Sequence, residues 1–231
     1  MPNPVRAPIR IELDTTMFND PIISGLNGAA TTTTTNLNFI LKTIQIAKTF
    51  YESRLQVGTM ATIYAPPDCV GYTPSTTAQG SGYANADLVI FVHYLSDATI
   101  TYGATGKSCK YVTGTATTMS PDSTLTVGRP TFGRIIFNTY NLVDRVSALT
   151  NRLFQSITST VLHETMHILG FDSTLYATYL DPAVGAPYSL GTTIAGIVNA
   201  NRPNTTFLKT PYVLAWAKDF FGCSSLTGMP L

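Results

Sequence analysis

One short segment of the sequence brings together three side chains that are able to do metal chemistry. It reads His163-Glu164-Thr165-Met166-His167, so the two histidines are four positions apart. On an α-helix, side chains at positions i and i+4 lie one above the other, and both imidazoles can reach one metal ion. Glu164 projects about 100° away around the helix, where its carboxylate can take a proton from a water molecule that zinc acidifies and pass it to a leaving amine. The spacing therefore predicts a zinc site that hydrolyses peptide bonds.

The motif is improbable by chance. The chain contains three histidines and three glutamates, which gives a random match an expectation well below about 0.01. The alternative is a pair of polar residues on an exposed face of a helix. We expect the motif to be buried, which would cost several kcal/mol without a partner and which a metal ion would satisfy. This expectation comes from its apolar neighbours Val161, Leu162, Met166, Ile168 and Leu169.

A catalytic zinc ion usually has three protein ligands, so a third one must be sought. No histidine follows His167 and no glutamate follows Glu164, which excludes a downstream glutamate ligand within this chain. The metzincin spacing H-E-x-x-H-x-x-G-x-x-H is matched through Gly170, but its last position is Ser173. A histidine within an apolar strand is more often structural than a ligand, and an aspartate near a helix end is more often a turn residue. The ligand candidates are His93, Asp172, Asp181 and Asp219.

The composition excludes several classes of protein. Apolar residues make up 44% of the chain, which is enough to build a core and argues against disorder. The net charge is +1 and Lys and Arg form no cluster, so we expect no nucleic-acid partner. Charged residues make up only 12%, a surface more typical of extracellular proteins. No apolar run approaches the roughly 18 residues that cross a bilayer, and the first ten residues lack the apolar core of a secretory signal.

The pattern of apolar residues predicts an α/β fold. Helical spacing over residues 38–55 and 146–169 indicates two long helices, and Gly170 is placed to end the second one. Residues 86–94 form a continuous β-branched and aromatic run, typical of a strand buried on both faces. Strands that alternate with helices favour a mixed sheet. We also expect strands at residues 9–13, 102–118 and 134–138, a helix at 211–221, and loops at 69–82 and 171–210.

Several segments outside the motif, taken with it, resemble one protein family. They are Pro8-Ile9-Arg10-Ile11, residues 86–92, residues 128–138 with their Gly-Arg-Pro start, Gly170-Phe171 after the motif, and residues 210–231. Together they look like leishmanolysin, the surface metalloprotease family of trypanosomatids that is also widespread in ciliates. The resemblance extends over nearly the whole chain.

This resemblance implies a fold and a division of the chain. The fold is a zincin-like, twisted mixed sheet with a backing helix and an active-site helix, followed by a loop-rich insertion and a final helix. Residues 128–138 would be the sheet strand immediately before the active-site helix. Residues 1–170 would form an N-terminal catalytic subdomain, and residues 171–231 the start of a C-terminal subdomain. The implied location is secreted or at the cell surface, with surface association through regions outside this chain.

The resemblance also implies a site and its substrates. One zinc ion would be bound by His163 and His167, Glu164 would be the general base, and the substrates would be proteins or peptides. In the family a long insertion precedes the third zinc histidine, which is expected here beyond Leu231. The chain thus looks like a core cut at both ends. Because two imidazoles hold zinc poorly, we expect these 231 residues to have weak or no activity.

Two rival functions and two structural questions stay open at this point. The first rival is a non-catalytic binding or adhesion module that keeps the fold, and the second is a zincin completed by an aspartate. Cys69 and Cys109 could bridge each other, while Cys223 could pair with a residue beyond Leu231. The strand near residues 104–112 could bind substrate by strand addition, or it could be an ordinary edge.

Overall fold

The computed structural model describes residues 6–19, 34–112, 128–141, 151–176, 179–181, 186–187, 194–199 and 202–230. The chain divides into two compact units, Met1–Gly170 and Phe171–Leu231. Their assignment as a catalytic subdomain and the start of a C-terminal subdomain stays a prediction. Parts of two predicted elements, residues 113–118 of a strand and 146–150 of a helix, lie outside the described residues.

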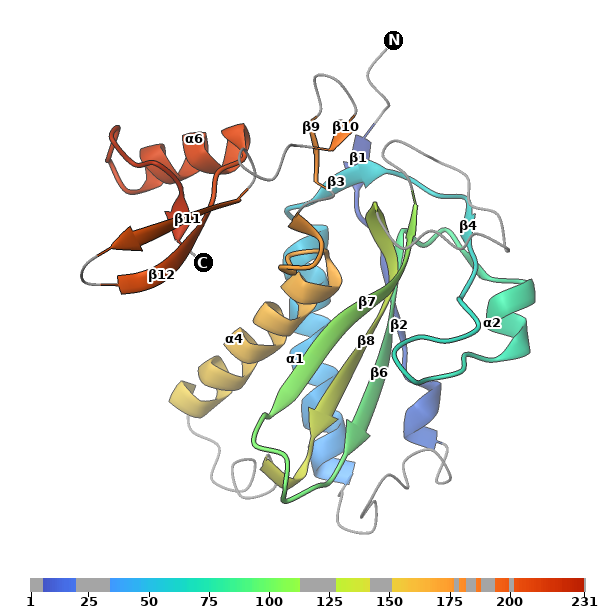
Figure 1. Cartoon of the computed structure of the whole chain (residues 1–231). Coiled ribbons are helices and arrows are strands. Elements are labelled where there is room, and N and C mark those ends of the chain that lie inside the picture. The colour runs from blue at the N-terminus through green and yellow to red at the C-terminus, as the bar shows by residue number, and fades with distance from the viewer. Residues whose placement is uncertain are drawn as a thin grey trace. The chain divides into compact units, whose positions relative to one another are not determined.

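The first unit is built on a four-stranded mixed sheet (Figure 1). Three of its strands, β2, β6 and β8, are parallel to one another. The fourth strand, β7, is antiparallel to β8 and forms one edge of the sheet. The α/β fold and the mixed sheet expected from the sequence are therefore confirmed. The strands in order across the sheet are β2 (Ile11–Asp14), β6 (Leu88–Leu95), β8 (Arg129–Asn138) and β7 (Ala104–Val112).

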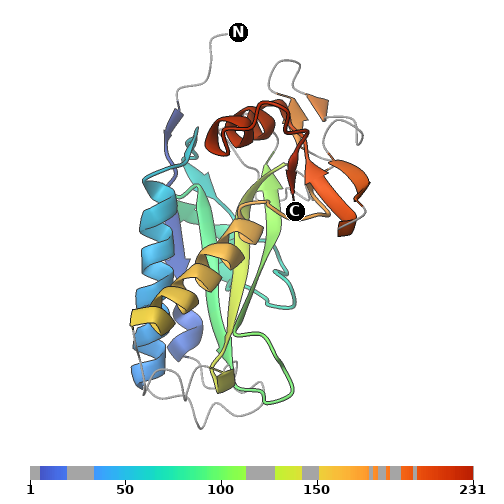
Figure 2. The same ribbon diagram turned by 90° about the vertical axis from the view of Figure 1, so that its left-hand side faces the viewer.

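Two long helices, α1 (Thr34–Glu52) and α4 (Asn151–Ile168), pack on the same face of this sheet. The views in Figures 1 and 2 agree on this arrangement. Both helices were predicted from apolar spacing, and α1 begins four residues earlier than expected. Burial of their apolar sides stabilises the layer, because each fully buried aliphatic side chain contributes about 1.5–3 kcal/mol. The core between helices and sheet includes Ile40, Ile44, Ala47, Val161, Ile168, Leu88, Ile90, Val92, Ile135 and Phe137.

The opposite face of the sheet has a second apolar core, formed with the segment between β3 (Gln56–Gly58) and β6. Alternate residues of β6 belong to the two cores: Ile90 faces the helices, whereas Phe91 faces this segment. Strand β6 is thus buried on both faces, as its continuous apolar run predicted. Other members of the second core are Met60, Ile63, Cys69, Tyr72, Val89 and Phe132.

Two buried connections fasten this segment to the sheet. Cys69 and Cys109 form a disulfide that joins it to β7, which settles one pairing that the sequence left open. The Asp87 carboxylate accepts hydrogen bonds from the backbone N–H of Met60 at 2.6 Å and from the guanidinium Nε of Arg10 at 2.8 Å. Burial alone would raise the pKa of Asp87, but the bonds from Arg10 and Met60 outweigh it and the net direction is downward.

The structure differs from the sequence-based expectation at two places in the first unit. A short helix, α2 (Thr76–Gly80), lies within residues 69–82, which were expected to be loop. Its cap explains it, because the Ser75 hydroxyl accepts from the N–H of Ala78 at 3.1 Å. Strand β8 begins at Arg129 rather than at 134, where the apolar pattern placed its start, because its pairing with β7 extends to Arg129. These bounds agree with the strand at 128–138 that the family resemblance implied. The remaining short elements are β1 (Arg6–Pro8), paired with β3, η1 (Thr16–Asn19), and the pair β4 (Thr62–Ile63) and β5 (Tyr83–Ala84).

The second unit contains more strand than the sequence suggested. Residues 171–210 were expected to be loop-rich, but they contain the pair β9 (Leu180–Asp181) and β10 (Ala186–Pro187) and the longer pair β11 (Ile194–Asn199) and β12 (Arg202–Leu208). Strand β13 (Met229–Pro230) joins β12 to complete a three-stranded sheet. The predicted last helix is confirmed as α6 (Pro211–Phe220), and Gly222 follows it with a φ of 60°.

Candidate metal centre

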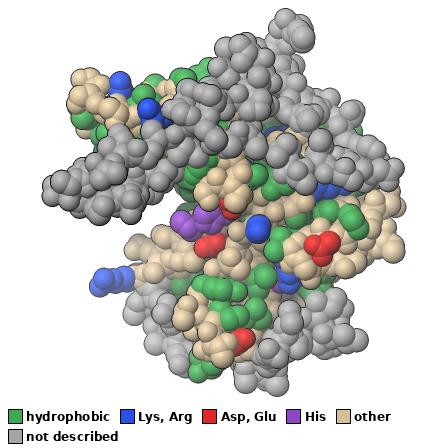
Figure 3. All heavy atoms as spheres, viewed as in Figure 1, with side chains coloured by type: hydrophobic (Ala, Val, Ile, Leu, Met, Phe, Trp, Pro, Cys, Tyr) green, Lys and Arg blue, Asp and Glu red, His purple; other side chains and the backbone are tan. Residues whose placement is uncertain are grey.

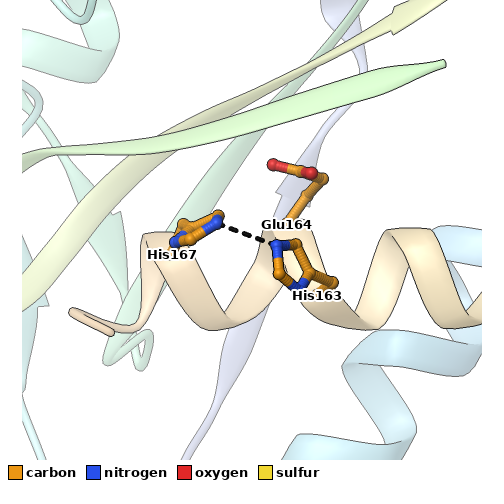
Figure 4. A group of neighbouring side chains, drawn as sticks. All are labelled: His163, Glu164 and His167. Atoms are coloured by element: carbon orange, nitrogen blue, oxygen red, sulfur yellow. Dashed lines mark hydrogen bonds between the residues drawn. The ribbon is translucent and has the colours of Figure 1, made fainter. Parts of the chain in front are cut away.

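Helix α4 places the two histidines of the motif against each other. His163 and His167 are one turn apart, and Figure 4 shows their rings pointing toward one another. Their Nε2 atoms are 3.1 Å apart, and the ring planes are perpendicular. With a carboxylate oxygen of Glu164 they form a group whose potential ligand atoms all lie within 4.8 Å of one another. In the described part of the chain this is the one group of its kind.

The spacing of the two nitrogens fits a zinc ion. Zinc binds imidazole nitrogen at about 2.0–2.1 Å in a tetrahedral arrangement, which separates two such ligands by roughly 3.3 Å. The observed 3.1 Å is close to this value without any movement of the helix. Imidazole nitrogen is also a ligand that zinc accepts readily, and the neighbouring carboxylate is available as a base. The residues present therefore fit the metal that the sequence predicts.

The motif is more exposed than its neighbours suggested. His163 is exposed, His167 and Glu164 are half-buried, and Met166 is 38% exposed. Figure 3 shows histidine side chains at the surface, close to acidic ones. The expected burial is wrong because the apolar residues nearby, such as Val161 and Ile168, turn to the other side of α4 and into the core. The case for a metal site thus depends on the spacing and geometry of the donors, and exposure gives substrate and water access.

Glu164 contacts the edge strand of the sheet. Its side chain points from α4 toward β7 in Figure 4. Its carboxylate oxygen Oε2 accepts a hydrogen bond from the backbone N–H of Gly106 at 2.8 Å. Gly106 was not identified from the sequence, although a glycine inside a strand is itself a sign that another backbone approaches closely.

Two further contacts hold the motif end of α4 in place. The Tyr51 hydroxyl of α1 donates to the backbone carbonyl of Leu162, the residue before His163, at 2.8 Å. Burial raises the pKa of Tyr51 to about 12, so this hydroxyl stays a donor across the physiological range. At the end of the helix, Gly170 has a φ of 103° and its N–H donates to the carbonyl of His167 at 3.1 Å.

His93 lies on the other face of the sheet from the motif. Successive side chains of β6 point to opposite faces of the sheet, and His93 is on the same face as Phe91. Phe91 belongs to the core on the side of the sheet opposite α4. His93 is 2% exposed, its ring contacts Tyr72 edge-on, and its Nδ1 accepts from the Nε of Arg134 at 2.8 Å. The interpretation of His93 as a structural histidine agrees with this environment, and a role as the third ligand does not.

The aspartate candidates belong to the second unit. Asp172 accepts hydrogen bonds from the N–H and the hydroxyl of Thr174, at 2.8 and 2.6 Å, which is the turn geometry expected for it. Asp181 lies in β9 and Asp219 in α6. A ligand role for any of the three stays a prediction.

Comparison with known proteins gives the family. The sequence model of leishmanolysin matches residues 36–231. This span includes most of α1, three of the four strands of the main sheet, α4 with its histidines, and α6. No curated protein matches the chain. Leishmanolysins are zinc-dependent metallopeptidases that act on peptides, and they are generally extracellular or surface proteins. None of the helices that the structure describes is long and apolar enough to span a bilayer. Because the match covers most of the sequence and includes the helix with the metal motif, the chain belongs to the leishmanolysin family of metallopeptidases.

Proposed function

We propose that this protein is a zinc-dependent metalloendopeptidase in which His163 and His167 bind the metal and Glu164 is the general base. The observation that carries the proposal is the 3.1 Å separation of the two facing Nε2 atoms, with a Glu164 oxygen in the same 4.8 Å group. Membership of the leishmanolysin family supports it independently. The substrates would be proteins or peptides.

Each residue has a separate task in this mechanism. When bound, zinc would polarise the scissile carbonyl and lower the pKa of a water molecule. His163 and His167 would hold the metal, and α4 fixes their facing positions. Glu164 has one oxygen, Oε2, held by Gly106, which leaves Oε1 to take the proton of the attacking water and deliver it to the leaving amine.

We further propose that residues 1–170 form the catalytic subdomain, that residues 171–231 begin a C-terminal subdomain, and that the protein acts outside the cell or at its surface. The Cys69–Cys109 disulfide supports the location, because disulfides persist in oxidising compartments and are rare in the cytosol. The positions of the motif residues within the first unit support the division.

Zinc binding and peptide hydrolysis, measured on the same preparations, test this function. We expect one zinc ion per chain, lost in His163→Ala and in His167→Ala. Glu164→Gln should keep the zinc but lower hydrolysis of a fluorogenic peptide library by a factor of about 10²–10⁴, the usual contribution of a general base. The assay should be run with zinc in excess, so that hydrolysis is compared between proteins that are all loaded with the ion.

The same measurements distinguish the rival functions. A binding or adhesion module would bind zinc, hydrolyse no peptide, and be unchanged by Glu164→Gln. A zincin completed by an aspartate would bind zinc tightly and lose it in Asp172→Asn or Asp181→Asn. Zinc binding that survives both histidine replacements would contradict the site itself.

A further inference from the structure

Strand β7 crosses α4 at Gly106, and the backbone of this residue makes a contact that ordinary sheet pairing does not provide. In an antiparallel pair, successive N–H groups point alternately toward the partner strand and away from it. Strand β7 is an edge strand with β8 on one side only. The single N–H of Gly106 donates to Oε2 of Glu164 at 2.8 Å, so it is one of the N–H groups on the side away from β8. An edge N–H is thus satisfied by the carboxylate of the active-site helix.

Only a residue without a side chain can occupy this position. A Cβ at residue 106 would lie 2.3 Å from the carbonyl oxygen of Glu164 and 2.9 Å from its carbonyl carbon. Real Cβ atoms essentially never come closer than 3.0 Å to another heavy atom. The obstacle is the backbone of α4, which is unable to rotate away as a side chain would. The requirement at Gly106 is therefore space between β7 and α4, because its φ lies outside the left-handed region.

Two other glycines show that this feature is local. A Cβ at Gly103, three residues earlier, would meet nothing within 4 Å. A Cβ at Gly133 in β8 would meet the side chain of Ile168 at 2.3 Å, so this glycine also allows α4 to approach the sheet. The atoms nearest to a Cβ at Gly133 belong to Ile168 and Lys107, and none of them to Glu164. Gly103 and Gly133 are thus matched controls, the first without a packing role and the second with a packing role only.

The contact restricts a side chain that would otherwise be free. Glutamate has three rotatable side-chain bonds, and a half-buried carboxylate on a helix surface would occupy several rotamers. A hydrogen bond from a rigid backbone donor to a carboxylate is charge-assisted and selects one of them. In the selected rotamer a carboxylate oxygen lies within 4.8 Å of both imidazole nitrogens.

We propose that Gly106 is a positioning residue for the general base: its backbone N–H orients the carboxylate of Glu164 toward the metal centre, and its missing side chain allows that contact. The proposal rests on the proposed function of Glu164. It assigns a role to the edge strand that is separate from substrate pairing, because the donor at residue 106 is used within the protein.

Amide hydrogen exchange tests the contact without metal or activity. In the zinc-free, ¹⁵N-labelled protein, the residue 106 amide should be protected and its proton shifted downfield. In Glu164→Ala, exchange at residue 106 should be about tenfold faster or more, as expected for loss of a hydrogen bond to a charged group. The amide of Gly103 should be unchanged. Equal exchange at residue 106 in the two proteins would overturn the proposal, whatever the peptidase assay shows.

Kinetics test the role. Gly106→Ala should lower kcat about tenfold or more while zinc affinity and KM change little, whereas Gly103→Ala should match wild type. In a Glu164→Gln background, Gly106→Ala should cause little further loss of kcat, because the glycine acts through the glutamate.

A merely structural role predicts instead that Gly106→Ala and Gly133→Ala have the same effect on stability and zinc affinity. It also predicts that Gly106→Ala lowers kcat by the same factor in the wild-type and Glu164→Gln backgrounds. If Gly106→Ala does not fold, the exchange measurement on Glu164→Ala still decides. Failure of the proposed function would be seen in a different measurement, as zinc binding that persists in His163→Ala and His167→Ala.

Discussion

His93 differs from the two histidines of the metal centre in the properties that decide what a histidine does. It is 2% exposed, whereas His163 is exposed and His167 half-buried. Its Nδ1 accepts from Arg134, so the proton of the neutral ring is on Nε2. Burial first, and then the positive charge of Arg134, lowers the pKa of His93 to about 3. His93 is therefore a neutral hydrogen-bond acceptor at any pH at which the protein is expected to work.

This environment predicts a pH dependence of stability. The unfolded chain has an ordinary histidine with a pKa of about 6.5, while the pKa of His93 in the folded protein is about 3. Between these values the unfolded state binds a proton that the folded state does not, so the free energy of unfolding decreases as the pH falls. The contribution lost by pH 5 is about 2 kcal/mol. Urea denaturation at pH 7.5 and pH 5 measures it.

His93→Gln is the control, because it keeps a side-chain acceptor near Arg134 and does not titrate. All other groups titrate in both proteins, so the difference between their two pH dependences belongs to His93. We expect wild type to lose about 2 kcal/mol more than His93→Gln over this range. Equal losses would mean that His93 is protonated at pH 5 in the folded protein as it is in the unfolded chain, and would contradict the lowered pKa of His93.

The sequence was sufficient for some of these residues and not for others. His163, Glu164 and His167 could be placed together because the helical repeat alone determines the i, i+4 geometry. Gly106 could not be paired with Glu164, since the two are 58 positions apart and meet only where β7 crosses α4. His93 stayed a ligand candidate for a similar reason: strand alternation indicates two faces, but it does not say which face the active-site helix covers.

At the scale of elements, the position of α4 depends on α1 as well as on the sheet. Tyr51 is 7% exposed, and its hydroxyl joins the two helices directly before the metal motif by its bond to the carbonyl of Leu162. Aromatic contact adds to this, because Phe39 of α1 and Phe154 of α4 pack edge-to-face with centroids 6.1 Å apart. The backing helix thus fixes the helix that carries the ligands.

Tyr51→Phe tests this connection. It removes one hydrogen bond and leaves the ring in the core, so we expect the free energy of unfolding to decrease by about 1 kcal/mol. Tyr140→Phe is the matched control, because Tyr140 is 54% exposed and its loss should change stability by less than about 0.5 kcal/mol. Both are measured by urea denaturation. An equal effect of the two replacements would show that the bond between α1 and α4 contributes nothing to stability.

The elements that could be predicted are those whose own residues carry a clear apolar pattern or a terminating proline or glycine. Helices α1 and α6 and strand β6 have clear apolar patterns, and proline or glycine limits α6. The missed elements depend on partners. Helix α2 has five residues and is held by the Ser75 cap. The apolar pattern also missed the first part of β8, which pairs with β7 and which only the family resemblance implied. Strands β11 and β12 likewise stabilise each other.

Within the first unit, one covalent link joins segments that are far apart in sequence. The disulfide connects Cys69, which is fully buried in the core opposite the helices, to Cys109 in β7, 40 positions later. Arg134 of β8 reinforces the same region by donating to the carbonyl of Val70 at 2.7 Å. The segment that covers the sheet is thus fastened to the strand that contains Gly106. Cys223, in the second unit, has no disulfide partner among the described residues.

Removing this link should therefore affect the stability of the fold more than any single replacement above. Closing a loop of 40 residues restricts the unfolded chain, and the chain-entropy relation gives a contribution of about 4 kcal/mol. We expect the double replacement Cys69→Ala and Cys109→Ala to lower the free energy of unfolding by about this amount, which is a large fraction of the 5–15 kcal/mol typical of a domain. Cys223→Ala, measured in parallel by urea denaturation, should have no effect, and reductant should weaken wild type but not the double variant. A decrease below about 1 kcal/mol would show that the packing of the covering segment holds β7 without the disulfide. Sensitivity to reductant in the double variant would show that reductant acts at a site other than this disulfide, such as Cys223.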